Sequence, residues 1–403
     1  MANLLTGSFQ LMKTLNRTLI LNTIRKEGPI SRAEIAKRTK LTPPTVGNLV
    51  TELIEAELVL ETSQGKSKGG RRPTMLIFNA SHFYIIGLDI GSRRIKGVFT
   101  NLDADILDHY SLPIPKPLTN DLLIEHAVKV IEKLLEQNEH YSIERLIGIG
   151  VAMHGIIDVE KGISVFAPSL NLHNVPIKEE LEKHFNIMVK VENDARALAL
   201  GESWYGKGKE KSSFICINVG YGIGAGIVID GKLLHGHDHL VGEVGHMTID
   251  PHGPLCSCGN HGCLQALAAG PFIAKQAQEK LASGSESILT KWVEDGLELT
   301  SEIIAKGAKE GDSLCKEVLK EAGVYLGIGI TNLIHIVNPS LILLGGGVIK
   351  AGAFILESLQ ETVQKRALTE QAKATKIETI KLGEDGTAIG AVSLLLEEIL
   401  EKV

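Results

Sequence analysis

The sequence predicts an α/β protein in which a small winged helix-turn-helix head precedes a larger, two-lobed α/β body. Three observations lead to this fold class. Residues 1–76 carry a net charge of +6, whereas residues 77–403 carry −12. The basic part shows helical periodicity and ends in two short strand-like runs. From Phe83 on, Gly-rich hairpins alternate with helical segments in two successive halves, which is typical of lobes of related design.

Composition places the chain among globular proteins. Of its 403 residues, 44% are hydrophobic and 22% are charged. No apolar run reaches the ~18–20 residues of a membrane span, and the first residues lack the pattern of a signal peptide. The five cysteines, an odd number, do not resemble a secreted disulfide framework. We therefore expect a cytoplasmic protein that has no membrane partner.

The head begins with two predicted helices. Apolar residues recur at helical spacing in the first, which Gly28-Pro29 ends. These residues are Leu11, Leu15, Leu19 and Ile20. Ser31 then suits an N-cap, and Glu34 three residues later completes a capping box. The second helix should therefore run from Arg32 to about Arg38.

A third helix follows after a tight turn. Thr42 can cap it, and Pro43 occupies the first helical position, where its missing N–H costs least. The segment PPTVGNLVTELIEAE has one apolar face and an opposite face that carries Thr45, Asn48 and Thr51. Two short helices joined in this way predict a helix-turn-helix, whose second helix enters the major groove of DNA.

Two strand-like runs, Leu58–Thr62 and Thr74–Asn79, flank a Gly/Lys/Arg loop that suggests a wing reaching the minor groove. The basic charge of the head fits a polyanionic partner, and we expect operator DNA. The expected DNA-contacting residues are Ser31, Arg32, Thr42, Pro43, Thr45, Asn48, Lys68, Arg71 and Arg72. The alternatives are a three-helix protein-binding module and a basic surface that is merely solvated.

The body contains several buried strands that end in polar or Gly-rich turns. Tyr84–Ile90 is nearly all apolar and ends in Asp89-Ile90-Gly91. Another strand ends at Glu192-Asn193-Asp194, before a helix. A second hairpin carries four alternating glycines from Gly220 to Gly226, and residues 340–352 form a strand that runs into three glycines. Backbone N–H groups in such bends can hold phosphates, although a tight hairpin needs no ligand.

Three of the five cysteines lie within eight residues, and a histidine precedes them. The spacing of His246, Cys256, Cys258 and Cys263 is H-x9-C-x-C-x4-C, and three thiolates with one imidazole suit a closed tetrahedral Zn²⁺ site. Unliganded thiols or a redox pair are the alternatives. Cys216 and Cys315 lie in apolar surroundings and are expected in the core.

The ordered set of motifs resembles the ROK family of repressors, open reading frames and sugar kinases. The resemblance rests on DIG at 89–91, MHGIID at 153–158, END at 192–194, GYGIGAG at 220–226, GEVGH at 242–246, CSCGNHGC at 256–263 and LLGGGV at 343–348. It covers residues 80–403, and with the head the chain resembles the repressor branch, especially xylose-type repressors.

The resemblance implies an actin-like, ribonuclease-H-like body with a structural zinc and a sugar site in its cleft. The implied domains are the head at 1–80, a first lobe at 81–195 and a second lobe at 196–385 that holds the zinc and a dimerisation surface. A C-terminal helix at 386–403 would pack back on the first lobe. The implied sugar-binding residues are Asn171, Asn193, Asp194, Glu243, His246 and Gln265. As alternatives, Asn193-Asp194 could only cap a helix, and Glu243 could be a surface residue.

In the kinases of this family, the match to Asp194 is the catalytic base, but other positions depart from the kinase pattern. Ser92-Arg93-Arg94 replaces a small phosphate-wrapping turn, Tyr221 stands where kinases usually have Thr, and Gln265 replaces the usual Glu. We therefore expect no enzyme but a sugar-responsive repressor of carbohydrate-utilisation genes that binds DNA as a homodimer or higher oligomer. A sugar kinase with a fused DNA-binding head is the alternative, and sequestration by a sugar-transport component is a weaker one.

Overall fold

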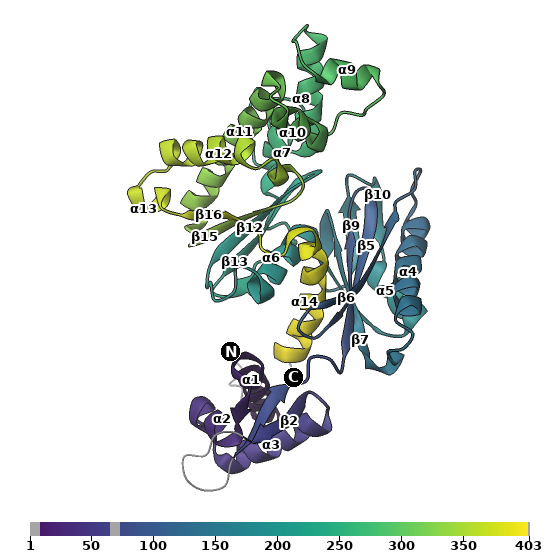
Figure 1. The fold of residues 1–403 in the computed structure, drawn as a ribbon, viewed down its shortest axis with the longest axis vertical. Coiled ribbons are helices and arrows are strands. Elements are labelled where there is room, and N and C mark those ends of the chain that lie inside the picture. Colours follow the sequence, from purple (N-terminus) through teal and green to yellow (C-terminus); the bar gives the residue numbers. More distant parts are fainter. Residues whose placement is uncertain (1–8, 65–72, 402–403) are drawn as a thin grey trace, which may run out of the picture.

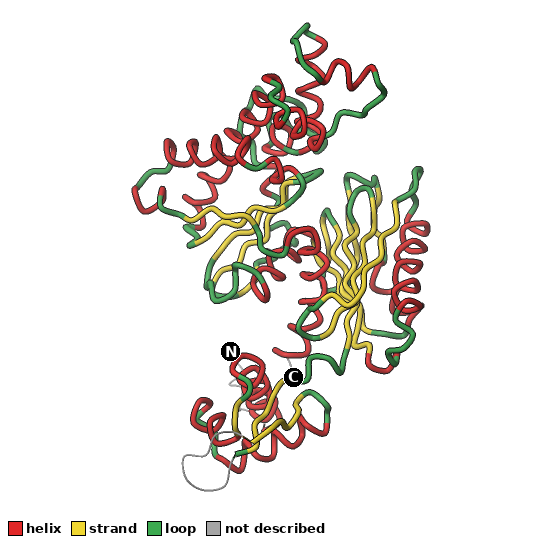
Figure 2. Tube along the Cα trace, viewed as in Figure 1, coloured by secondary structure: helices red, strands yellow, loops and turns green. Residues whose placement is uncertain are grey.

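The computed structural model describes residues 9–64 and 73–401. It contains a small head and two larger lobes (Figure 1). The lobes are built around separate sheets that helices cover (Figure 2). The expected α/β fold with an N-terminal helix-turn-helix is thus confirmed. Among the described residues, no helix is both long and apolar enough to cross a membrane.

The head has three helices and a small antiparallel sheet of strand order β1-β3-β2. Its elements are α1 (Phe9–Glu27), β1 (Ile30–Ser31), α2 (Arg32–Thr39), α3 (Pro43–Glu55), β2 (Val59–Gln64) and β3 (Thr74–Phe78). Ser31 caps α2 and forms the expected capping box with Glu34. Thr42 caps α3, which begins at Pro43. Local hydrogen bonding therefore fixes where both helices begin.

The buried face of α1 differs from the stripe that the spacing indicated. Leu15 and Leu19 are 52% and 44% exposed, whereas Ile20, Leu21 and Ile24 form the buried face. The side chain of Leu11 lies outside those described. Several leucines at helical spacing can lie on either side of a long helix, and contacts with α3 and β3 select the side that is buried.

The first lobe is a five-stranded mixed sheet of order β11-β7-β4-β5-β6. Its strands are β4 (Tyr84–Ile90), β5 (Arg94–Asn101), β6 (Ile106–Pro113), β7 (Leu146–Met153) and β11 (Met188–Asn193). Helices α4 (Asn120–Gln137) and α5 (Ile177–Phe185) cover one face. A small sheet joins β8 (Ile156–Asp158), β9 (Ile163–Ala167) and β10 (Leu172–Val175).

The second lobe repeats this plan with the order β14-β13-β12-β15-β16. Its strands are β12 (Phe214–Val219), β13 (Ile223–Ile229), β14 (Lys232–Leu233), β15 (Leu341–Gly345) and β16 (Lys376–Thr379). Its helices are α7 (Leu264–Ala268), α8 (Gly270–Ala282), α9 (Leu289–Glu294), α10 (Ser301–Lys309), α11 (Ser313–Val337), α12 (Ala353–Arg366) and α13 (Glu370–Lys373). In both lobes an antiparallel hairpin extends two parallel strands.

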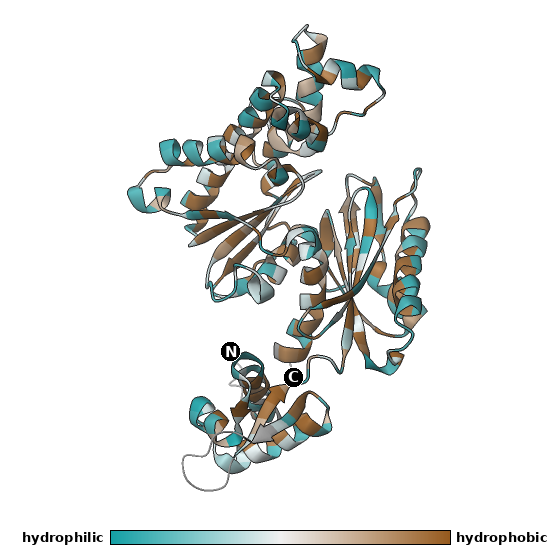
Figure 3. Cartoon of the chain, viewed as in Figure 1, coloured by the Kyte–Doolittle hydropathy of each residue, from teal (hydrophilic) through white to brown (hydrophobic). Residues whose placement is uncertain are grey.

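Two helices lie between the lobes, α6 (Asp194–Tyr205) and α14 (Gly386–Glu401) (Figure 1). The largely apolar α14 packs on β4 and β7 (Figure 3). Glycines permit this closeness, because a Cβ at Gly150 would lie 1.9 Å from the Ala391 carbonyl oxygen and one at Gly390 equally close to that of Ala197. The expected boundary between residues 195 and 196 falls in the first turn of α6, so α6 belongs to the junction.

Candidate functional site

A cavity of about 760 Å³ lies between the lobes, at the carboxyl ends of strands from both sheets. Asp89 lines it from β4, and Asp194 follows β11. From the second lobe, Asn218 at the end of β12 and the glycines after β15 complete the wall. Open α/β sheets place ligand sites at this edge, so the cavity is the candidate small-molecule site.

Asn193 and Asp194 lie where β11 becomes α6. The Asn193 side-chain oxygen accepts hydrogen bonds from the backbone N–H groups of Ala195 and Arg196, at 3.0 and 3.1 Å. Its amide nitrogen donates to the Gly155 carbonyl oxygen at 3.0 Å. Asn193 thus caps α6 and ties it to the turn after β7, while Asp194 accepts a 3.3 Å hydrogen bond from Asn218 of the second lobe.

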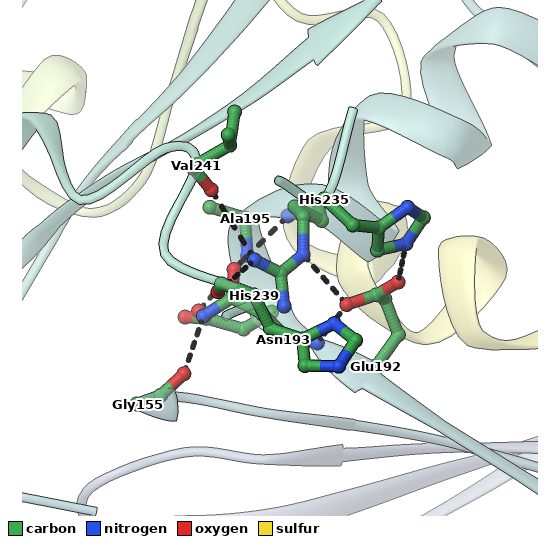
Figure 4. Close-up of polar contacts among 9 residues, drawn as sticks. Gly155, Glu192, Asn193, Ala195, His235, His239 and Val241 are labelled. Carbon is green, nitrogen blue, oxygen red and sulfur yellow. Dashed lines mark hydrogen bonds and ion pairs between the residues drawn. The ribbon is translucent and has the colours of Figure 1, made fainter. Parts of the chain in front are cut away.

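A buried ion-pair network supports this junction (Figure 4). Glu192 and Arg196 are only 2% and 1% exposed, and the Arg196 Nε donates to Glu192 at 2.7 Å. His235 contacts the other oxygen of Glu192 at 2.7 Å. Arg196 also donates to the carbonyl oxygens of His239 and Val241, at 2.9 and 3.2 Å. The network therefore holds the loop that leads to Glu243 against the start of α6.

Glu192 stays ionised in this setting. Burial opposes its charge, but the hydrogen bond from His235 and the positive charge of Arg196 outweigh burial and hold the pKa of Glu192 below its ordinary value.

Two carboxyl groups that line the cavity, those of Asp89 and Glu243, behave in the opposite way. Burial, and then the charge of Asp194, raise the pKa of Asp89 to about 7, although Lys96 opposes the shift. Burial and Asp194 likewise raise the pKa of Glu243, which Arg196 opposes. Together with Glu384, the carboxyl groups of Asp89, Asp194 and Glu243 line one cavity, where they can accept hydrogen bonds from the hydroxyl groups of a polyol.

The predicted metal ligands do come together. The ligand atoms of His246, Cys256, Cys258 and Cys263 all lie within 4.8 Å of one another. His246 Nδ1 faces the Cys256 Sγ at 3.8 Å, and its Nε2 faces Glu243 at 4.0 Å. One ring nitrogen is therefore available to a metal while the other faces the cavity, which His246 also lines.

Gln265 lies between the cysteine cluster and the cavity. Its amide nitrogen donates to the Cys256 sulfur at 3.4 Å and to the Ser257 hydroxyl at 3.2 Å. It lines the cavity together with Ser257. The geometry of the cysteine loop therefore fixes the position of Gln265.

The remaining residues that the sequence singled out do not all line the cavity. Ser92 and Tyr221 line the cavity, whereas Arg93 acts electrostatically on Glu302 of the second lobe. Asn171 is exposed and is not among the residues that line the cavity, so the structure does not place it with the other sugar-binding candidates. It has a left-handed φ of 53° in the turn before β10, and that turn presents Ser169 to the cavity instead.

The predicted DNA-contacting residues of the head differ in how exposed they are. Thr42, Pro43 and Asn48 are exposed at the start of α3, and Thr45 is half-buried. Ser31 is only 4% exposed, and its hydroxyl is used in the capping box with Glu34. The Arg32 side chain pairs with Glu61 at 2.8 Å. Lys68, Arg71 and Arg72 lie outside the described residues.

Sequence reasoning missed His154, Ser169, Glu192 and Arg196. Glu192 stood within the END motif, where it signalled only a strand end. Arg196 follows that motif, and an acid–base pair four residues apart across a helix start could have drawn attention to it. Nothing in the sequence connects His154 with Ser169, because the turn between β9 and β10 brings them together.

Comparisons with known proteins agree with this architecture. The ROK family model matches residues 85–398, and a winged helix-turn-helix DNA-binding model matches residues 15–59. The xylose repressor of Caldicellulosiruptor bescii is 35% identical over 394 residues, which cover 98% of each chain.

Solved structures agree as well. A ROK family transcriptional regulator described as a homolog of the E. coli MLC protein has a TM-score of 0.86 and 28% identity, with 97% of each chain covered. A ROK family glucokinase from Streptomyces griseus, in complex with glucose and AMPPNP, has a TM-score of 0.70 and 26% identity and covers 77% of this chain and 98% of its own. With its fold, its cysteine cluster and its family match in agreement, this chain belongs to the ROK family and carries an N-terminal winged helix-turn-helix.

Proposed function

We propose that this protein is a sugar-responsive transcriptional repressor of carbohydrate-utilisation genes, located in the cytoplasm. The observation that carries the proposal is the presence, on one chain, of a helix-turn-helix head and a carboxylate-lined cavity. The similarity to a xylose repressor over nearly the full length supports it. The head would occupy residues 1–80, and the lobes 81–195 and 196–385, with α14 packed back on the first.

The head would bind operator DNA through α3. Thr42, Pro43 and Asn48 are exposed at its start, where a recognition helix contacts base edges. A homodimer would present two heads to half-sites about one helical turn apart, roughly 34 Å. Arg71 and Arg72 of the wing would reach the minor groove or its phosphates.

In the cavity, Asp194, Glu243, His246 and Gln265 would hold the sugar. Asn193 would contribute mainly by positioning Asp194, because both acceptor positions of its oxygen serve α6. Asn171 is not among the residues that line the cavity, so a contact of Asn171 with the sugar stays a prediction.

A structural Zn²⁺ ion fits the cysteine cluster. Three thiolates and one imidazole are the donors that zinc prefers, and their close approach suits tetrahedral coordination. His246, Cys256, Cys258 and Cys263 would hold the ion. The metal would lock the cysteine loop, to which Gln265 of α7 donates hydrogen bonds, and orient the free nitrogen of His246 toward the sugar.

Two helices give the cavity a route to the head. Helix α6 starts at Asp194 in the cavity and ends near Trp204, whose ring lies under the Arg25 guanidinium of α1 at 4.5 Å. Helix α14 starts near Thr387 in the cavity wall, and near its end the Leu400 carbonyl accepts a 3.0 Å hydrogen bond from Asn22 of α1. A sugar that changes the lobe angle would therefore move both supports of α1.

The sugar relieves repression only if it binds the DNA-free form more tightly than the DNA-bound form. A hundredfold loss of operator affinity corresponds to about 2.7 kcal/mol of coupling.

The alternative function is a sugar kinase with a fused head. The glucokinase that shares the fold favours it, and Asp194 remains available as a base. Exposed Tyr221 in the second glycine loop stands against it. Sugar-dependent ADP formation at the rate of a kinase would support the alternative.

Fluorescence anisotropy tests the proposal. Labelled promoter DNA of the protein's own locus is titrated with protein at fixed salt and then challenged with D-xylose, D-glucose and N-acetyl-D-glucosamine. Specific binding that one sugar reverses is the expected result. Absence of specific DNA binding would overturn the repressor function.

A further inference from the structure

The first-lobe wall of the cavity carries two polar side chains outside the proposed sugar-binding set, His154 and Ser169. His154 follows β7, and Ser169 lies in the turn between β9 and β10. Both line the cavity. His154 Nε2 and Ser169 Oγ form a hydrogen bond with each other, so the two side chains act as one polar unit.

The surroundings of His154 determine which atom donates in this pair. His154 Nδ1 faces the carbonyl oxygen of Ile90 at 3.4 Å, and a carbonyl can only accept. Nδ1 therefore carries the hydrogen. Burial lowers the pKa of His154, although Asp194 opposes the shift, so the ring is neutral and its Nε2 is an acceptor. Ser169 must donate its hydroxyl hydrogen to Nε2, which leaves only oxygen lone pairs facing the cavity.

The pair lines the same cavity as Asp194. The carboxylate of Asp194 acts electrostatically on the His154 ring. Asn193 donates to the Gly155 carbonyl, and this bond fixes the turn that carries His154 to the start of α6. Because the Asn193 oxygen already accepts two backbone hydrogen bonds, it has no acceptor position left for a ligand. Ser169 supplies a neutral acceptor on the same wall.

We propose that Ser169 is a specificity-determining residue, whose oxygen accepts a hydrogen bond from one hydroxyl of the bound sugar. His154 is its positioning residue, because it turns the serine hydrogen away from the ligand. The inference rests on the proposed sugar-binding function. A site built in this way discriminates against a sugar that lacks a donor at that carbon, because the acceptor is then left unpaired.

Titration calorimetry with sugar derivatives tests this inference. The probes are D-xylose, each of its monodeoxy derivatives and each matching deoxyfluoro derivative, or the same series of D-glucose if only that sugar binds. Fluorine cannot donate a hydrogen bond. A deoxy or deoxyfluoro sugar that is changed at the carbon facing Ser169 should therefore bind the wild type roughly tenfold more weakly than the parent sugar. To Ser169→Ala, the parent sugar and both derivatives should bind with equal affinity.

Matched variants separate recognition from folding. Ser164→Ala removes a buried hydroxyl of β9 that has no hydrogen-bond partner among the described residues and does not line the cavity. It should bind every sugar as the wild type does. His154→Leu should lose the discrimination at the same carbon, and His154→Gln, which retains an acceptor, should restore part of it. A cooperative urea unfolding transition shows that the body of each variant is folded, and unchanged operator binding without sugar shows that its head is intact.

The outcomes distinguish this inference from the function on which it rests. If the wild type binds a sugar but Ser169→Ala shows the same losses at every carbon, Ser169 is not a specificity determinant and the proposed function stands. If, at the carbon whose loss disappears in Ser169→Ala, the deoxyfluoro derivative retains the affinity that its deoxy counterpart loses, Ser169 donates and the assigned role of His154 is wrong. If the wild type binds none of D-xylose, D-glucose and N-acetyl-D-glucosamine, the sugar response of the proposed function itself fails.

Discussion

Breaking the buried ion pair between Glu192 and Arg196 should be among the most costly single changes in the body. Both side chains are at most 2% exposed, so solvent screens their interaction little. Loss of one partner from such a pair typically costs about 3–5 kcal/mol, because the other charge stays buried. In Arg196→Met, Glu192 keeps its hydrogen bonds from His235 and the Asn193 backbone, so we expect about 3 kcal/mol.

Urea denaturation can measure this cost. In a Trp292→Phe background, the fluorescence of Trp204 reports on the end of α6. A double-mutant cycle with Glu192→Gln should show a coupling of about 1–3 kcal/mol. The matched control is Lys129→Met, which breaks an exposed pair with Glu125 at the same i,i+4 spacing and should cost at most about 0.5 kcal/mol. Single losses below about 1 kcal/mol, or additive losses, would refute the reasoning.

Three further predictions concern the head, the cavity and the metal centre. Trp204→Ala should reduce the effect of sugar on operator affinity by roughly fivefold, since a cation–π contact contributes about 1 kcal/mol, and anisotropy with and without sugar measures this effect. Asp89→Asn should be more stable than the wild type at pH 8, and its advantage should shrink as the pH falls through 7 toward 4. The folded pKa of Asp89 is raised to about 7, so ionisation above it destabilises the wild type, and thermal melts across this range test the sign. Cys258→Ser should lower the bound zinc, measured by elemental analysis, and should weaken sugar binding more than operator binding; full zinc occupancy would contradict the assigned ligands.

Local signals in the sequence predicted much of the fold. The capping box at Ser31 and Glu34 and the apolar run of Tyr84–Ile90 depend on neighbouring residues, and the structure has both as expected. The cysteine cluster was also visible, because its spacing is short and specific.

Features that depend on packing were not predictable in the same way. The exposed side of α1 depends on which of its residues α3 and β3 cover. The spacing of Leu15 and Leu19 therefore predicted a buried face that is exposed in the structure. Asn171 looked suitable by residue type, but its backbone turn places Ser169 at the cavity. The network of Glu192, Arg196 and His235 joins residues up to 43 positions apart, which no local pattern indicates.

The position of α14 has a consequence for synthesis on the ribosome. This helix covers β4 and β7, yet its residues emerge roughly 300 positions after β4, or about 15–60 s later at ordinary elongation rates. During that interval the sheet face that α14 will cover stays open, and α1 lacks its contact with Leu400. A nascent chain can complete its head early and can form the contact of Arg25 with Trp204 once α6 has emerged, but the second support of α1 arrives only with α14.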